Sequence, residues 1–140
     1  MEIRKAKVDD WKSISELLNH LDYPNTESFI KEKIKKLLNH PDEDLLVYEV
    51  SGKVIAFISI HFIPQLALKG DFARISYFVV DSKIRSKGIG RKLEEFCTEL
   101  ATKRNCDRIE VHCHTRRKNA HSFYSRQGYN ESPKYFIKML

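Results

Sequence analysis

The sequence predicts an α/β fold in which helices flank one mixed sheet. One observation is the Ser51-Gly52 pair, which separates two strand-like segments in the manner of a β-hairpin. A second is the alternation of strand-like and helical segments from residue 72 onward, which implies packed layers of strands and helices. The third is the length of 140 residues, enough for one domain with a full core, which we expect to span residues 1–140.

The first half of the chain is expected to hold three strands, at residues 2–7, 45–50 and 53–63, and two helices. Asp9 or Asp10 can cap the first helix, whose apolar face would be Trp11, Ile14, Leu17, Leu18 and Leu21. Residues 25–28 start the second helix and Pro41 marks its end; its inward residues would be Phe29, Ile30, Ile34, Leu37 and Leu38.

The second half is expected to begin with a loop at residues 65–71 and a strand at 72–80. A helix at 90–103, a strand at 108–113, a helix at 118–126 and a last strand at 134–139 follow. Gly128 stands where a left-handed residue would end the last helix. The helix at 90–103 has one apolar face, made of Leu93, Phe96, Cys97, Leu100 and Ala101.

Composition and charge limit the classes of function that the chain can have. Hydrophobic residues make up 41% and charged residues 31%, as in a soluble globular domain. No apolar run approaches the ~20 residues that cross a bilayer, and no signal peptide is visible, so we expect a cytoplasmic location and no membrane partner. Three cysteines without a Cys-x-x-Cys pair favour reduced thiols. The net charge of +6 suits a nucleotide cofactor, an acidic substrate or RNA, or only a solvated surface.

A glycine-bearing turn at residues 85–90 reads Arg-Ser-Lys-Gly-Ile-Gly between a strand and a helix. Such a turn aims backbone N–H groups outward, and the helix start adds partial positive charge, so the turn favours phosphate. Gly88 and Gly90 would let an anion come close. The spacing fits neither a dinucleotide-binding motif, because Leu93 stands where the third glycine belongs, nor a Walker loop.

A second motif lies at residues 117–129, Arg-Lys-Asn-Ala-His-Ser-Phe-Tyr-Ser-Arg-Gln-Gly-Tyr. On a helix, Ala120, Phe123 and Tyr124 share one face. Taken alone, Tyr124 fits a core aromatic as well as a functional residue.

Together the two segments resemble the GNAT superfamily of N-acetyltransferases. Its motif A runs from a strand into Arg/Gln-x-x-Gly-x-Gly/Ala, as residues 78–90 do here. Its motif B, Ala-x-x-x-Tyr-x-x-x-Gly-Phe/Tyr, is matched by Ala120, Tyr124, Gly128 and Tyr129. The resemblance covers the whole chain and implies a single-domain GNAT fold with a mostly antiparallel sheet, splayed centrally, and about four helices. Residues 117–129 and the aromatic tail look most like aminoalkylphosphonate N-acetyltransferases and are also similar to small aminoglycoside 6′-N-acetyltransferases.

The resemblance implies acetyl-CoA as co-substrate. Backbone N–H groups of the turn would hold the pyrophosphate, and the preceding strand would pair with the pantetheine arm where the sheet splays. The implied donor site is Phe78, Val79, Val80, Arg85, Ser86, Lys87, Gly88, Ile89 and Gly90. Arg117 replaces an asparagine of many relatives, and it would reach a CoA phosphate or simply be solvated.

The implied chemistry needs a base for the amine, a donor for the oxyanion and an acid for the leaving thiolate. The N–H of Val80 or a neighbour would serve the oxyanion. Tyr124 is implied as general acid, because the family's tyrosine at this position points at the CoA sulfur and a phenol stays protonated at neutral pH. The base departs from the pattern, since Arg74, Ser76 and Tyr77 stand where many relatives have a glutamate.

Several groups could replace that missing base. Histidine has a suitable pKa, and we place His61 first and His114 second, with His112, Glu110 and a water chain as alternatives. Each histidine could also be only structural. His112 and His114 could supply two metal ligands beside Glu110, but no third ligand is evident, so no metal is expected.

The acceptor is expected to be the primary amine of a small molecule, bound by Tyr23, Arg74, Tyr77 and Tyr135. Arg74 suggests an acceptor that carries a negative group. Acetylation of a protein amine or an aminoacyl-tRNA is the second hypothesis, and a non-catalytic acyl-CoA-binding or nucleic-acid-binding module is the third. A homodimer is a further open expectation, because dimers are common among relatives.

Overall fold

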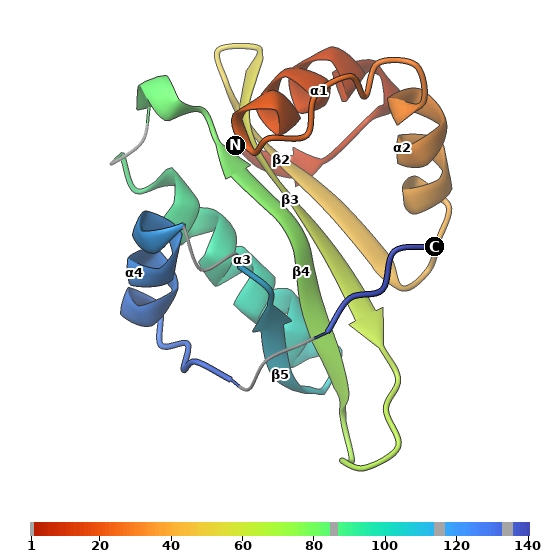
Figure 1. The fold of residues 1–140 in the computed structure, drawn as a ribbon, viewed down its shortest axis with the longest axis vertical. Helices are drawn as coiled ribbons and strands as arrows, with labels where there is room; N and C mark the ends of the chain where they lie inside the picture. The colour runs from red at the N-terminus through yellow and green to blue at the C-terminus, as the bar shows by residue number, and fades with distance from the viewer. Residues whose placement is uncertain (1, 85–86, 114–116, 133–135) are drawn as a thin grey trace.

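The computed structural model describes residues 2–84, 87–113, 117–132 and 136–140. In these residues, five strands form one sheet: β1 (Ile3–Lys5), β2 (Glu43–Val50), β3 (Lys53–Ile63), β4 (Asp71–Val80) and β5 (Cys106–Val111). The helices are α1 (Trp11–His20), α2 (Ile30–Leu38), α3 (Ile89–Lys103) and α4 (Lys118–Arg126), with short 3-10 turns η1 (Val8–Asp10) and η2 (Ser82–Ile84). Figure 1 shows α1 and α2 on one face of the sheet and α3 and α4 on the other.

The strands are in sequence order, β1-β2-β3-β4-β5. The first four pair antiparallel, and β4 pairs with β5 in parallel. Ser51 and Gly52 both have positive φ, as a tight hairpin turn between β2 and β3 requires. The predicted mixed, mostly antiparallel sheet is therefore confirmed, and so are the helices that flank it.

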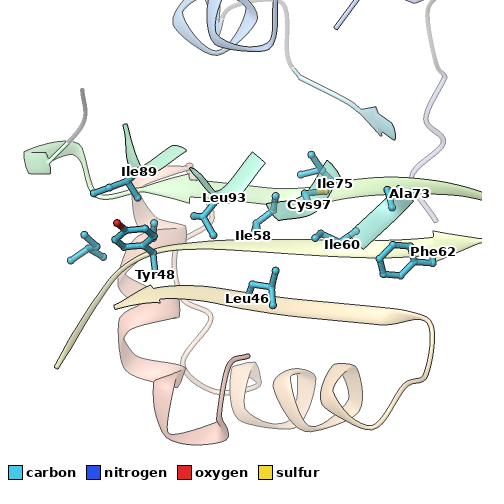
Figure 2. Close-up of a cluster of buried hydrophobic side chains, with 13 residues drawn as sticks. Leu46, Tyr48, Ile58, Ile60, Phe62, Ala73, Ile75, Ile89, Leu93 and Cys97 are labelled. Atoms are coloured by element: carbon cyan, nitrogen blue, oxygen red, sulfur yellow. The ribbon is translucent and has the colours of Figure 1, made fainter. Parts of the chain in front are cut away.

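The central strand β3 is buried on both faces because helices cover both sides of the sheet (Figure 1), while β2 and β4 pair with its two edges. Its residues Ile58 and Ile60 pack against Leu93 of α3 in the core cluster that Figure 2 shows. Phe57 points the other way and packs with Ile34 of α2. This period-two alternation places apolar side chains on both faces of the sheet. Packing on both faces holds β3 in place beside β4, whose second half lines the site.

The sheet splays after the first half of β4. β4 pairs with β5 only from Asp71 to Ile75. From Tyr77 to Val80, β4 has β3 as its hydrogen-bonded neighbour among the described strands. The outer edge of this segment therefore presents backbone N–H and C=O groups that no described strand takes. The central splay of the predicted fold is confirmed.

Two expectations about the helices and strands at the start and end of the chain are wrong. Phe29 and Leu38, expected to face inward, are 47% and 37% exposed. α2 begins only at Ile30, and its inward stripe runs through Ile30 and Ile34, which leaves both residues at its ends outside. The last strand expected at 134–139 is absent from residues 136–140, where Phe136 is 92% exposed. An alternating apolar pattern needs a neighbouring strand to bury it, and these described residues pair with none.

β5 begins and ends two residues earlier than residues 108–113. His112 therefore lies beyond the strand, and His114 lies outside the described residues, so the two do not share a described strand face. No helix in the part of the chain that the structure describes is both long enough and apolar enough to span a membrane.

Candidate active site

Two adjoining hollows lie at the open edge of β4. The larger is a groove of about 820 Å³ between the end of β4, the start of α3 and one side of α4. The smaller is a cavity of about 300 Å³ between the segment after α1, the middle of β4 and the segment after β5. The two share the lining residues Leu21, Phe78, Arg117 and Tyr124. A molecule in the groove would therefore meet a molecule in the cavity beside Tyr124.

The start of α3 forms one end of the groove. Gly88 precedes α3 with φ of +76°, and a Cβ placed there would meet nothing within 4 Å. A glycine here holds the turn in a left-handed conformation and leaves the backbone open to the groove. The first N–H groups of a helix lack acceptors within it and carry partial positive charge, so this end of the groove suits an anion. Arg91 lines the same end, where it also pairs with Glu95 at 2.9 Å.

Gly90 lines the groove and also has a packing role that the sequence did not predict. A Cβ on Gly90 would stand 3.3 Å from Cε1 of Phe123, so the glycine allows α4 to pack against the start of α3. The Phe123 ring also lies edge-on to Phe78, with 5.7 Å between centroids. The small residue in motif A and the aromatic residue in motif B are thus parts of one packing contact.

Tyr124 projects from α4 to the junction of the groove and the cavity. Its ring packs edge-on against Phe123 and Tyr129, at centroid distances of 5.3 and 5.4 Å. Burial raises the pKa of Tyr124 well above its ordinary value, and the neighbouring thiol of Cys113 adds to the rise. The phenol is therefore protonated throughout the physiological range and is a proton donor.

Arg117 precedes α4 and also lines both hollows. Its Nη1 donates to Cys113 Sγ at 3.8 Å. Burial raises the pKa of the Cys113 thiol, and Arg117 partly offsets the rise. The arrangement fixes a permanent positive charge beside Tyr124.

His61 on β3 lies in a chain of three polar side chains. Its Nε2 is 2.6 Å from Oγ of Ser76 on β4, and its Nδ1 contacts Oε2 of Glu43 on β2. Ser76 lines the smaller cavity, so His61 reaches that cavity through the Ser76 hydroxyl. His112 lines the cavity directly. No group of three or more potential metal ligands occurs among the residues that the structure describes.

The residues expected to bind the acceptor divide into two groups. Tyr23 and Tyr77 both line the smaller cavity, where their rings are edge-on with centroids 5.4 Å apart. Burial raises the pKa of Tyr77. Arg74 instead lies beside Glu110 of β5, to which its Nη2 donates at 3.0 Å, and it is absent from the lining of both hollows. The charge of Arg74 is thus already paired in the described structure.

Comparison with known proteins settles the family. The model of the acetyltransferase (GNAT) family matches residues 7–129, which include both motifs and every described residue of the groove and cavity. The chain belongs to the GNAT family. It is an acetyl-CoA-dependent N-acetyltransferase.

This GNAT enzyme is similar to two proteins named for their substrates and to a solved structure of the family. It is 29% identical over 144 residues to the aminoalkylphosphonate N-acetyltransferase of Salmonella typhimurium, covering 99% of this chain and 91% of the relative. It is 27% identical to the glucosamine 6-phosphate N-acetyltransferase of Arabidopsis thaliana, covering 91% and 88%. It is also similar to the crystal structure of a GNAT family acetyltransferase from Staphylococcus aureus, with a TM-score of 0.82 and 27% identity over 100% of both chains.

Some site predictions fall outside the described residues of this GNAT enzyme, namely Arg85, Ser86, His114 and Tyr135. The described donor-site residues Phe78, Val79, Val80, Gly88, Ile89, Gly90 and Arg117 all line the groove, and Lys87 is exposed next to Gly88.

Sequence reasoning missed a buried polar contact that holds α4 on α3. Tyr129 Oη donates to Glu94 Oε2 at 3.0 Å, and Thr98 donates to the same oxygen at 2.8 Å. Glu94 is only 5% exposed. A carboxylate on the apolar side of a predicted helix, with an aromatic hydroxyl in the next motif, was the signal that could have revealed it. Asp22, whose backbone has φ of 65°, was also missed in the lining of the cavity.

Proposed function

We propose that this enzyme moves an acetyl group from acetyl-CoA to the primary amine of a small molecule, by direct transfer within one N-acetyltransferase domain over residues 1–140. The observation that carries the proposal is the junction of groove and cavity at Tyr124. A donor in the groove and an acceptor in the cavity would present their reacting atoms to each other there, and such positioning alone lowers the barrier substantially.

The groove would hold the donor. Its pyrophosphate would lie at the start of α3, with Arg85, Ser86, Lys87, Gly88, Ile89 and Gly90 supplying backbone N–H groups. The pantetheine arm would pair with the open edge at Phe78, Val79 and Val80, as an added strand does. Arg117 would bind a phosphate or the acceptor's anionic group. The free edge and the Gly88 backbone both fit such a ligand.

The transfer would proceed by attack of the neutral amine on the thioester carbonyl. The N–H of Val80 would stabilise the oxyanion. As the C–S bond breaks, the Tyr124 hydroxyl would give its proton to the thiolate, and the amine nitrogen would lose a proton to the base. The products are an N-acetyl amine and CoA, and exchange with solvent would return a proton to Tyr124 and remove one from the base. His61 is our first choice of base and His114 our second.

The acceptor is proposed to be a small amine with an anionic group. The cavity of about 300 Å³ suits a small molecule, and the net charge of +6 favours an anion. The two relatives named above act on an aminoalkylphosphonate and on glucosamine 6-phosphate, each an amine that carries an acidic phosphorus group. Tyr23 and Tyr77 would line the acceptor site, with Tyr135 as a further predicted residue. Arg74 lines neither hollow and is paired with Glu110, so we assign it no direct contact with the acceptor.

An amine panel tests the proposal. Thiol release from acetyl-CoA would be measured with aminoalkylphosphonates, glucosamine 6-phosphate, amino acids, polyamines and aminoglycosides. We expect turnover with a phosphorus-bearing amine and a much higher KM for the same amine without that group. Acetylation of a protein amine or aminoacyl-tRNA alone would favour the second hypothesis. Tight CoA binding without transfer to any acceptor would favour a non-catalytic binding module.

A further inference from the structure

Three neighbouring strands place Glu43, His61 and Ser76 in one polar row beside the acceptor cavity. Glu43 on β2 is directly opposite His61 on β3 in the strand register. His61 is opposite Arg74 on β4, and Ser76 follows two residues later. The register between β3 and β4 shifts at this point: Ser59 is opposite Tyr77, and Ile60 is opposite Ile75. Ser76 is thus the additional residue of a β-bulge, a device that re-aims a side chain.

The contacts in this row indicate which atom donates and which accepts in each hydrogen bond. Glu43 Oε2 is buried, and it has no hydrogen-bond partner in the part of the chain that the structure describes. Nδ1 of His61 is the group that contacts it. An ionised carboxylate can only accept, so the proton of the neutral imidazole belongs on Nδ1. Nε2 is then an acceptor, and the Ser76 hydroxyl donates to it over 2.6 Å. The other acceptor near Ser76 Oγ, the carbonyl of Ser59, is 3.4 Å away.

With its hydrogen turned toward His61, Ser76 Oγ offers its lone pairs to the cavity. Ser76 lines that cavity together with Tyr124, whereas His61 and Glu43 do not line it. Because Ser76 lines the cavity and His61 does not, the Ser76 hydroxyl is the group placed to accept an N–H from an amine there and to pass a proton on to His61.

We propose that Ser76 is a catalytic proton relay, and that Glu43 positions the His61 imidazole behind it. This inference rests on the proposed acetyl transfer. As the N–C bond forms, one proton moves from the amine nitrogen to Ser76 Oγ, and the Ser76 hydroxyl proton moves to His61 Nε2. Ser76 is a neutral hydroxyl before and after the step. His61 becomes imidazolium, which the carboxylate of Glu43 stabilises, and it later releases the proton to solvent. Tyr124 separately protonates the thiolate and then regains a proton from solvent, so the enzyme returns to its starting state with no further reactant.

The test compares variants in acetyl transfer to the best amine of the panel. Ser76→Ala should lower kcat at least 10²-fold, the usual scale of general-base catalysis, with the Kd for acetyl-CoA changed less than about twofold. Ser76→Thr keeps a hydroxyl and should recover most of the rate. Added imidazole should rescue His61→Ala but not Ser76→Ala. His40→Gln, which alters an exposed histidine that precedes β2 and lines neither hollow, is the control for loss of a histidine. Full activity of Ser76→Ala alongside an active wild type would overturn the relay while leaving the transferase proposal intact.

A readout on the free enzyme does not depend on the acceptor. With ¹⁵N-labelled histidine, the neutral form of His61 should carry its proton on Nδ1, and Glu43→Gln should disturb that resonance while His40→Gln does not. A neutral His61 protonated on Nε2 would contradict the direction of the relay.

Mass spectrometry after incubation with acetyl-CoA alone should find Ser76 unmodified. An acetylated Ser76 would show that this residue is a nucleophile and not a relay. Failure of the wild type to acetylate any amine would refute the transferase proposal and the relay's role together.

Discussion

Phe78 on β4 and Tyr124 on α4 meet at the same junction, because each lines both the groove and the cavity. Phe123 links them, because its ring is edge-on to Phe78 at 5.7 Å and to Tyr124 at 5.3 Å. The aromatic contact holds α4 against the open half of β4. The position of the Tyr124 hydroxyl is therefore set by packing, as a group that must meet a leaving thiolate requires.

Tyr124→Phe removes the proposed acid and keeps the ring contacts. We expect kcat to fall about 10²-fold or more, with nearly unchanged affinity for acetyl-CoA and unchanged thermal unfolding. Steady-state kinetics together with calorimetric titration of acetyl-CoA would measure both quantities. Wild-type turnover in this variant would remove Tyr124 from the role of general acid.

Gly88→Glu tests the anion site at the start of α3. The substitution places a side chain and a negative charge where the pyrophosphate is expected, so binding of CoA should be lost. Gly52→Glu in the β2–β3 hairpin is a matched control, because both glycines have positive φ and open space at the Cβ position. Both variants should lose similar stability from backbone strain. Equal CoA affinity in the two variants would count against the site.

Asp10 should make the free energy of unfolding depend measurably on pH. Arg4 donates two hydrogen bonds of 2.9 Å to its carboxylate. Burial opposes ionisation, but Arg4 and the Lys7 N–H outweigh it and lower the pKa of Asp10. A lowered native pKa contributes stability that is complete above the unfolded pKa, about 3.9, and lost as the pH falls through the native pKa.

Asp10→Asn should therefore lower the free energy of unfolding by about 1–2 kcal/mol at pH 7. Urea unfolding at several pH values should show the difference from wild type shrinking below about pH 4. Asp9→Asn, at the adjacent exposed carboxylate, should have little effect at any pH. A difference between wild type and Asp10→Asn that stayed constant down to pH 3 would show that the ionised carboxylate is not what stabilises this end of the sheet.

Tyr129→Phe should destabilise the contact between α4 and α3. It removes the hydroxyl that donates to the buried Glu94 and leaves Thr98 as the remaining side-chain donor that the described structure gives this oxygen. We expect a loss of about 1–3 kcal/mol in the free energy of unfolding. Chemical denaturation would measure it, with Thr98→Val as a parallel variant that removes the other donor. Unchanged stability in both variants would mean that solvent satisfies Glu94.

The sequence allowed prediction of local elements better than of contacts between them. The helix at 118–126 and the Ser51-Gly52 hairpin follow from local patterns, and the structure confirms them. The expected strand at 134–139 failed because alternation predicts a strand only where a neighbour exists to pair with it. The roles of Ser76 and Gly90 depend on a register shift and on a ring from another helix. Neither can be read from the residues within a few positions along the chain.

Direct transfer where the groove and the cavity meet at Tyr124 can be tested by kinetics. Initial rates would be measured with acetyl-CoA and the best amine, each varied at several fixed concentrations of the other. Direct transfer requires both substrates to be bound together, so double-reciprocal plots should give intersecting lines. Parallel lines, together with an acetylated enzyme isolated in the absence of amine, would rule out direct transfer.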